Sequence, residues 1–352
     1  MTTRERMNLT FKHREADRVP VLGSPWQTTL ERWKREGMPE DADFSQYFGL
    51  DKTANISVDI SPSYEEKIIE ETDEYLIQKS SWGTTFKNWK HASSTPHFMD
   101  HTITDRKSWQ EAKKRMQMTA DRVDWNKLDE NYGPWREKGV WINAAFWFGF
   151  DITHSKITGT ERLLVMMAED PGLVTDIFNT QLDCNIKLFE LVLNKGYKFD
   201  CMFWWDDMGY RNGTFFSAAM YRDILKPVHK RAIDWAHEKG VYAHLHSCGN
   251  INAFLPELAE IGLDALNPLE VKAGMDPVEI KKAYGDKFVL HGGLNAMLWD
   301  DIEKTEEEIR RLLPVLKQGG GYIFQEDHSI PDSVSLEDFR RIVEITKELG
   351  KY

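Results

Sequence analysis

Cysteine is scarce in this sequence, which has Cys184, Cys201 and Cys248 among its 352 residues. Three widely spaced cysteines cannot form a disulfide framework, and at least one of them must be unpaired. This usage is typical of proteins from a reducing compartment. The N-terminal residues are charged and lack the apolar stretch of a secretory signal. We therefore expect a cytoplasmic protein.

Long hydrophobic runs and an excess of positive charge are absent as well. No stretch of about 18 apolar residues occurs that could cross a membrane. The 57 acidic residues outnumber the 45 basic ones, which gives a formal net charge of −12. Proteins that bind nucleic acids usually carry a basic face. We therefore expect neither a nucleic acid nor a membrane as a partner.

The sequence has no internal repeat, and no Gly-x-Gly-x-x-Gly follows a predicted strand, so a dinucleotide-binding domain is not expected. From about Val140 onward, short apolar stretches alternate with amphipathic helical segments. This alternation predicts βα units around a parallel sheet. At least five units follow Val140, and strands in the N-terminal part bring eight within reach. We predict an α/β fold, a single (β/α)8 barrel over residues 1–352.

The N-terminal part, about residues 1–135, is less regular and is predicted to extend the barrel. Arg18 to Gly23 reads as a short buried strand, and Leu30 to Gly37 reads as a helix that ends at a glycine. Residues Glu74 to Trp89 alternate with period two around Ser-Ser-Trp-Gly. This pattern predicts a small β-hairpin insertion.

Polar side chains follow several predicted strands, where the reactive residues of a barrel enzyme would lie. The candidates are Asp206, Asp207, His246, Cys248, Glu270 and His328. Because all barrel strands end at the same mouth, we expect these side chains to come together.

His246 and Cys248 are two residues apart, so on an extended strand they face the same side. Imidazole and thiolate are both good zinc ligands, and a catalytic zinc needs three protein ligands and an open position. Glu270 and His328 would supply the remaining ligands. The alternative is a strand end with a buried cysteine and a hydrogen-bonded histidine, and from spacing alone it is the commoner one.

Asp206 and Asp207 are candidates for a general acid or base next to bulky tryptophans. Alternatively, an aspartate at a strand end caps the following turn. Since neighbouring residues of a strand face opposite ways, we expect only one of the two to point into the mouth.

Aromatic residues are unusually frequent, and some follow the predicted strands. Trp26, Trp147 and Trp204 are predicted to line a pocket for an apolar or flat ligand. For any single one of them, an ordinary place in the core is the simpler interpretation.

Several segments resemble the uroporphyrinogen decarboxylase superfamily over nearly the whole chain. They are the opening "MTTRERMNLTFKHREADRVPV", the central "WWDDMGYRNGTFFSAAMYRDILKPVHKRAIDWAHEKG" and "HSCGNINAFLPELAEIGLDALNPLE", and the closing "EDHSIPDSVSLEDFRRIVEITKELG". The resemblance implies a single (β/α)8 barrel and two different chemistries. One branch decarboxylates a polyanionic tetrapyrrole without a metal, and the other transfers methyl groups.

The decarboxylases hold their substrate with arginines in the N-terminal part and carry a C-terminal Gly-His-Gly. Here the matching strand end, "VLGSPWQ", has no arginine pair, and "QEDHSIP" stands in place of Gly-His-Gly. The methyltransferase branch carries a His-x-Cys zinc motif, which His246 and Cys248 match. Glu270 matches a glutamate found one strand later in cobalamin-independent methionine synthases. The family's last ligand is a cysteine, and His328 lies closest to its place.

The resemblance to the methyltransferase branch therefore implies a zinc-dependent enzyme. It would move a methyl group between a small methylated substrate and a corrinoid protein or a thiol acceptor, with cobalamin supplied by the corrinoid protein. The alternative is a uroporphyrinogen decarboxylase or a related metal-free decarboxylase, and a third hypothesis is a non-catalytic partner of a corrinoid protein. A homodimer is our hypothesis for the assembly.

Overall fold

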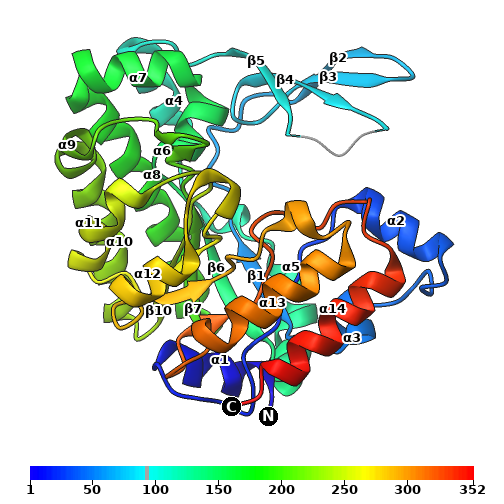
Figure 1. Ribbon diagram of the computed structural model, residues 1–352. Helices are drawn as coiled ribbons and strands as arrows, with labels where there is room; N and C mark the ends of the chain where they lie inside the picture. The colour runs from blue at the N-terminus through cyan, green and yellow to red at the C-terminus, as the bar shows by residue number, and fades with distance from the viewer. Residues whose placement is uncertain (92–94) are drawn as a thin grey trace.

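A curled parallel sheet forms the centre of the molecule (Figure 1). It is known from a computed structural model, which describes residues 1–91 and 95–352. Seven strands follow one another in the order β1-β6-β7-β10-β11-β12-β13. They are β1 (Thr53–Ser57), β6 (Trp141–Trp147), β7 (Cys201–Trp205), β10 (Tyr242–His246), β11 (Ala265–Asn267), β12 (Val289–His291) and β13 (Tyr322–Ile323).

The segment around Val21 closes this sheet into a barrel. Val21 forms a parallel bridge with Phe324, directly after β13, and the Asp51 N–H, just before β1, donates to the Val21 carbonyl at 2.9 Å. The short strand predicted near Val21 thus fills the eighth position between β13 and β1. The predicted (β/α)8 barrel is confirmed.

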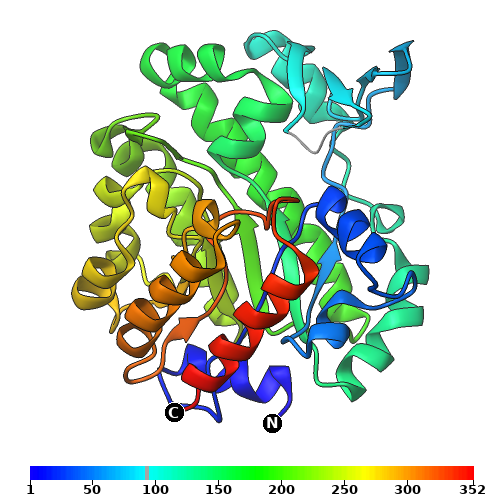
Figure 2. The same cartoon turned by 45° about the vertical axis from the view of Figure 1, so that its right-hand side comes forward.

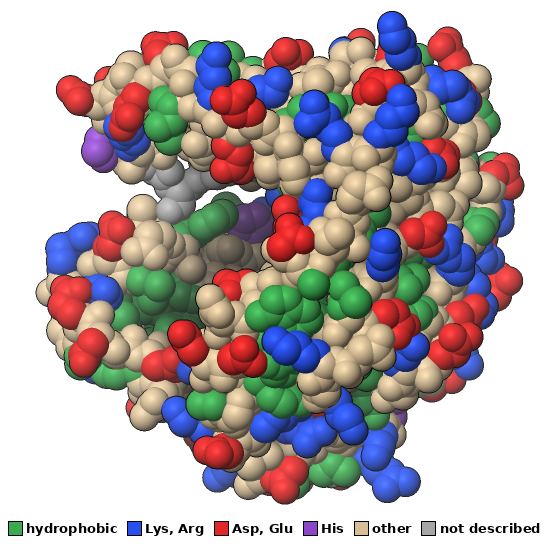
Figure 3. Space-filling model, turned by 180° about the vertical axis from the view of Figure 1, so that it is seen from behind, with side chains coloured by type: hydrophobic (Ala, Val, Ile, Leu, Met, Phe, Trp, Pro, Cys, Tyr) green, Lys and Arg blue, Asp and Glu red, His purple; other side chains and the backbone are tan. Residues whose placement is uncertain are grey.

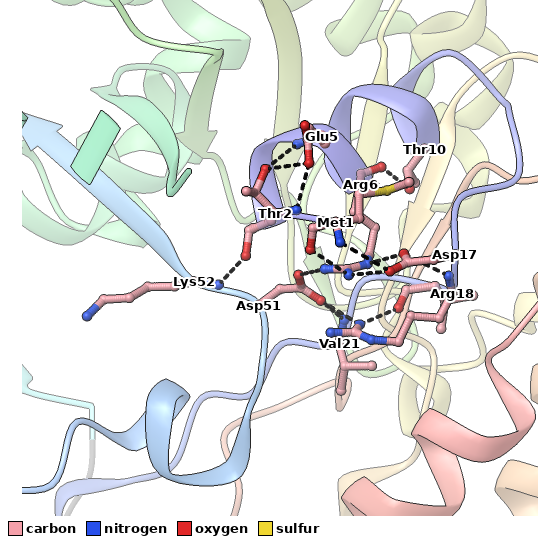
Figure 4. Close-up of polar contacts among 12 residues, drawn as sticks. Met1, Thr2, Glu5, Arg6, Thr10, Asp17, Arg18, Val21, Asp51 and Lys52 are labelled. Carbon is pink, nitrogen blue, oxygen red and sulfur yellow. Dashed lines mark hydrogen bonds and ion pairs between the residues drawn. The ribbon is translucent and has the colours of Figure 1, made fainter. Parts of the chain in front are cut away.

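A buried ionic network fastens this closure (Figure 4). The Asp51 carboxylate accepts a hydrogen bond from the Val21 N–H at 2.8 Å and pairs with the guanidinium groups of Arg6 and Arg18. Arg6 lies on α1 (Thr3–Phe11), which crosses the N-terminal end of the barrel. There the Phe11 ring stacks on Trp141, with ring centroids 5.2 Å apart. The predicted N-terminal extension therefore plugs the bottom of the barrel.

Helices surround the strands as an outer layer (Figure 2). After α1 they are α2 (Gln27–Arg35), α3 (Phe44–Phe48), α4 (Arg106–Arg115), α5 (Trp125–Glu137), α6 (Phe150–Ile152), α7 (Thr160–Glu169), α8 (Pro171–Asn194), α9 (Ala218–Met220), α10 (Lys226–Glu238), α11 (Leu255–Glu260), α12 (Pro277–Tyr284), α13 (Ile302–Leu316) and α14 (Leu336–Leu349). The main core lies between these helices and the outward faces of the strands. No helix in the described part of the chain is long and apolar enough to cross a membrane.

A small antiparallel sheet is inserted after β1 and stands beyond the C-terminal ends of the barrel strands (Figure 1). The predicted hairpin is confirmed as β3 (Tyr75–Lys79) and β4 (Thr84–Trp89). Two further strands flank it, β2 (Lys67–Glu71) and β5 (His97–His101). A third, two-stranded sheet of β8 (Gly209–Tyr210) and β9 (Gly213–Thr214) follows β7. These insertions add walls to the mouth of the barrel.

Candidate metal centre

Three potential metal ligands converge where β7 and β10 end. The two strands are parallel neighbours, and His246 pairs with Trp205 in their register. Asp207 and Cys248 therefore follow their strands side by side. The Cys248 Sγ lies 3.3 Å from the His246 Nε2, and an Asp207 oxygen lies 3.6 Å from the same nitrogen. One ligand atom of each residue lies within 4.8 Å of the other two.

The neighbouring strand fixes the orientation of the His246 ring. The His246 Nδ1 contacts the side-chain oxygen of Asn267, at the end of β11. Because an amide oxygen can only accept, the proton of a neutral His246 resides on Nδ1, and the Nε2 lone pair points toward Cys248 and Asp207. The Asn267 amide nitrogen in turn donates to the His291 carbonyl at 3.2 Å. Such a partner on the outer nitrogen is the usual arrangement of a metal-binding histidine.

The surroundings of Cys248 disfavour a bare thiolate. Burial raises the pKa of the Cys248 thiol well above its ordinary value, and the carboxylates of Asp207 and Glu270 raise it further. Burial also raises the pKa of Asp207, whereas His246 acts in the opposite direction. A divalent cation between these groups would favour both anionic forms. The nitrogen, sulfur and oxygen donors fit a zinc ion with an open coordination position.

Glu270 and His328 lie near this group but outside the set of three. A Glu270 oxygen accepts the Gly249 N–H at 2.6 Å, and the other lies 3.4 Å from the Lys272 ammonium. His328 is exposed, and its ring centroid lies 6.0 Å from that of Trp26. Their role as metal ligands stays a prediction.

Asp206 faces the other side of the barrel wall. Its side chain is fully buried, and one carboxylate oxygen lies 2.8 Å from the His229 Nε2 of α10. The other oxygen accepts the Asp151 N–H at 2.8 Å. A Cβ at Gly149, whose φ is +102°, would lie 2.3 Å from the carboxylate, so a glycine is needed there. Asp206 therefore connects the end of β7 to the surrounding helices through buried hydrogen bonds. Of the predicted catalytic pair, only Asp207 reaches the mouth.

The same alternation separates the two tryptophans of β7. Trp204 is fully buried and packs on Phe148 and His229, so it belongs to the core and not to a pocket wall. Its neighbour Trp205 points inward and stacks on Trp147, with ring centroids 4.5 Å apart and an interplanar angle of 13°. Trp205 is one of the aromatic residues at predicted strand ends, and period-two alternation from Asp207 assigns it to the inner face.

A cavity of about 300 Å³ fills the barrel interior below these rings. Trp205 and His246 line it together with His291, whose Nε2 lies 2.7 Å from the Gln325 side-chain oxygen. Burial lowers the pKa of His291 to about 4. No lysine or arginine is among the described residues that line this cavity. In Figure 3, a hollow between the inserted sheet and the barrel shows hydrophobic and histidine side chains in its depth.

A family model and several known proteins match this chain. The model of uroporphyrinogen decarboxylase (URO-D) matches residues 152–349, which is more than half of the chain. The chain belongs to the uroporphyrinogen decarboxylase family. The matched region contains Asp207, His246 and Cys248, so the converging groups lie within the family domain.

Curated members of the family match only part of this chain. Uroporphyrinogen decarboxylases of Pectobacterium carotovorum subsp. carotovorum and of Pectobacterium atrosepticum are each 30% identical over 99 residues, which is 28% of this chain. The match spans about a quarter (27%) of the length of those relatives. It therefore leaves the reaction of this chain open.

A solved structure extends the similarity to the whole chain. A methyltransferase from Methanosarcina mazei superposes with a TM-score of 0.68 and covers 99% of both chains at 17% sequence identity. At this identity the likeness shows that the two proteins share a fold.

Proposed function

We propose that the chain is a zinc-dependent methyltransferase of the uroporphyrinogen decarboxylase family. The observation that carries the proposal is the convergence of Asp207, His246 and Cys248 at the mouth of the barrel. A bound zinc ion would supply Lewis-acid chemistry, because it lowers the pKa of a coordinated thiol or polarises a methylated heteroatom. The fold likeness to a methyltransferase is compatible with this function.

In this proposal the protein groups divide the remaining tasks. Asn267 holds the His246 ring with its Nε2 toward the metal position. Asp207 accepts the Cys248 N–H at 2.8 Å and thereby fixes the loop that carries the sulfur. The Trp205 ring, which stacks on Trp147, lines the cavity next to His246.

We further propose Glu270 and His328 as ligands that complete the coordination in one state of the enzyme. Glu270 accepts the N–H of Gly249, the residue that follows Cys248, so a movement away from Gly249 would bring its carboxylate toward the metal position. His328 and Trp26 lie on two loops at the rim of the barrel. We propose Trp26 as a substrate contact there, and a corrinoid protein as the partner that supplies cobalamin.

Metal analysis of the purified protein tests the central claim. We expect one zinc per chain in the wild type and less than about a tenth of that in His246→Ala and in Cys248→Ser, since each change removes one of three ligands. Cys184→Ala is the matched control, because Cys184 is buried on α8 away from the mouth. Metal-free wild-type protein, or zinc retained in both site variants, would contradict the proposal.

Methyl transfer is tested with methylcobalamin as a substitute for the corrinoid protein. A small thiol is the acceptor: its thiolate takes the methyl group, the thiol proton goes to buffer, and the electron pair of the cobalt–carbon bond stays on cobalt. We expect formation of the thioether with zinc-loaded wild type and none with Cys248→Ser. If no thiol is methylated, the proposed acceptor is wrong.

The alternative is decarboxylation of uroporphyrinogen, and the matching curated relatives carry that name. A polyanionic substrate needs cationic groups in its site, and the described residues that line the interior cavity include no lysine or arginine. Incubation with uroporphyrinogen distinguishes the two functions. Conversion to a less carboxylated porphyrinogen by metal-free protein would establish the decarboxylase.

A further inference from the structure

The interior cavity contains two buried polar atoms without a partner in the described part of the chain. They are the indole Nε1 of Trp141 and the side-chain oxygen of Asn143. Both residues line the cavity, and Trp141 is 1% and Asn143 7% exposed. Leaving a buried donor or acceptor unpaired destabilises the folded protein. Because both residues line the cavity, a molecule bound there would be next to two groups that lack a hydrogen-bond partner.

The two atoms offer complementary hydrogen bonds from one wall. Trp141 and Asn143 are two residues apart on β6, so both side chains point into the barrel. The indole N–H can only donate. The Asn143 amide nitrogen already donates to the Asn55 side-chain oxygen at 3.0 Å, which leaves the Asn143 oxygen as an acceptor. A hydroxyl or a carboxamide both accepts and donates, so it satisfies both atoms.

The cavity offers no free charge to a ligand. Its described lining contains no lysine or arginine, and its one carboxylate is Asp51. That carboxylate pairs with Arg6 and Arg18 and accepts the Val21 N–H, so its charge is already compensated (Figure 4). An anionic ligand would lose its hydration and find no cation in exchange. The cavity therefore favours an uncharged ligand.

The same cavity reaches the candidate metal ligands. His246 lines it, and in the register of the sheet His246 pairs with Trp205, which pairs with Trp147. Asn143 precedes Trp147 by four residues, which corresponds to about 13 Å along the strand. A molecule that touches both Asn143 and the metal position must therefore be slender and roughly this long.

We propose that the barrel interior is the substrate site, and that it binds a slender, uncharged molecule whose hydroxyl or carboxamide end pairs with Trp141 and Asn143. The opposite, methylated end reaches His246 and Cys248. This second part rests on the proposed methyltransferase function, whereas the binding of the polar end does not.

Calorimetric titration of the purified protein, both as isolated and after loading with zinc, with three matched probes tests the site. The probes are para-methoxyphenyl butanol, the corresponding butanamide and the corresponding butanoic acid, which differ only in the polar end. We expect the alcohol and the amide to bind at least about 10-fold more tightly than the acid. Equal affinity for the acid, or binding of none of the three, would overturn the proposal.

Two variants locate the polar end of the ligand. Trp141→Phe and Asn143→Leu should each weaken binding of the alcohol about 5-fold, the equivalent of one hydrogen bond, and leave the zinc content unchanged. Trp141→Phe removes the unpaired donor but also shortens a fully buried ring that stacks on Phe11, so we expect a modestly lower melting temperature. The phenyl ring keeps part of this stacking, so Trp141→Phe provides a test even if Asn143→Leu does not fold. Unchanged affinity in Trp141→Phe would show that the polar end of the ligand does not pair with Trp141 and would overturn this part of the proposal.

The outcomes separate this proposal from the proposed function. If the protein binds no zinc and transfers no methyl group but still prefers the alcohol, the proposed interior site is supported and the proposed methyltransferase function is wrong. If the protein binds zinc and transfers methyl groups but binds neither the alcohol nor the amide, the proposed function is supported and the proposed interior site is wrong.

Discussion

Asp206 and Asp207 are adjacent in sequence, and each faces a histidine, but the two pairs lie on opposite sides of the barrel wall. Asp206 meets His229, whose Nδ1 lies 3.1 Å from the Tyr221 hydroxyl, and all three side chains are buried. Asp207 meets His246, whose Nδ1 contacts Asn267, and this group opens into the mouth. Similar chemistry thus yields a structural cross-link on one side and a candidate metal site on the other. The two pairs differ in their surroundings. Buried side chains enclose Asp206 and His229, whereas Asp207 and His246 lie next to Cys248 at the mouth.

Asp206→Asn should give the largest loss of stability. Removing the charge of a buried, hydrogen-bonded pair leaves His229 and the Asp151 N–H poorly satisfied, which costs about 4 kcal/mol. Urea denaturation monitored by circular dichroism measures the free energy of unfolding. Asp207→Asn is the matched control and should cost less than about 1 kcal/mol, since this side chain is partly exposed. Equal losses in both variants would erase the distinction between the two sides.

Glu308 shows what a buried carboxyl does without a histidine beside it. It lies on α13, forms no ion pair in the described part of the chain, and burial raises its pKa from 4.5 to about 7. Between these two pH values the folded state keeps a proton that the unfolded state has lost. Stability contributed by the protonated form is therefore present below about pH 4.5 and is lost as the pH rises to about 7.

Glu308→Gln should remove this pH dependence. Glutamine keeps the shape of the protonated carboxyl, so at pH 8 the variant should be more stable than the wild type by up to about 3 kcal/mol. Melting temperatures of both proteins between pH 4 and pH 8 measure the difference. Parallel curves for the two proteins would show that Glu308 is ionised in the folded state.

Asn267→Ala tests the residue that contacts His246 on the side that opens to the mouth. Without the Asn267 oxygen, the His246 ring is free to rotate or to change its tautomer, and zinc affinity should fall about 10- to 100-fold. Competition with a chromophoric chelator measures the affinity, and Asn267→Asp, which keeps an acceptor oxygen, should restore most of it. Wild-type affinity in Asn267→Ala would show that Asn267 does not position His246.

Tyr221→Phe tests the residue that contacts His229 on the buried side of the wall, and it should have the smallest effect of these changes. The change removes one hydrogen bond to His229 but keeps the ring, so we expect a loss of about 1 kcal/mol and no change in zinc content. Urea denaturation and metal analysis check both statements. A loss of zinc would mean that the two sides of the wall are coupled.

Much of this architecture is readable from local patterns. Alternating apolar strands and amphipathic helices predicted the barrel, and period-two alternation predicted the β3–β4 hairpin, because both signals depend on neighbours in sequence. The His246-x-Cys248 spacing likewise places two candidate ligands on one side of a strand end. The flanking strands β2 and β5 were not predicted, because most of their residues are exposed and the hydrophobic pattern is therefore weak.

The partners of these residues depended on packing between strands that lie far apart in sequence. Asp207 joined His246 and Cys248, and Asn267 took the outer nitrogen, because β7, β10 and β11 are neighbours in register. Which of Trp204 and Trp205 points into the barrel depended on how β7 is oriented within the sheet. The sequence by itself determined the strands, the barrel and the pairing of His246 with Cys248 as candidate ligands, through local periodicity. Only the tertiary structure decided which aspartate opens to the mouth and that the barrel keeps an uncharged cavity, because both follow from long-range register.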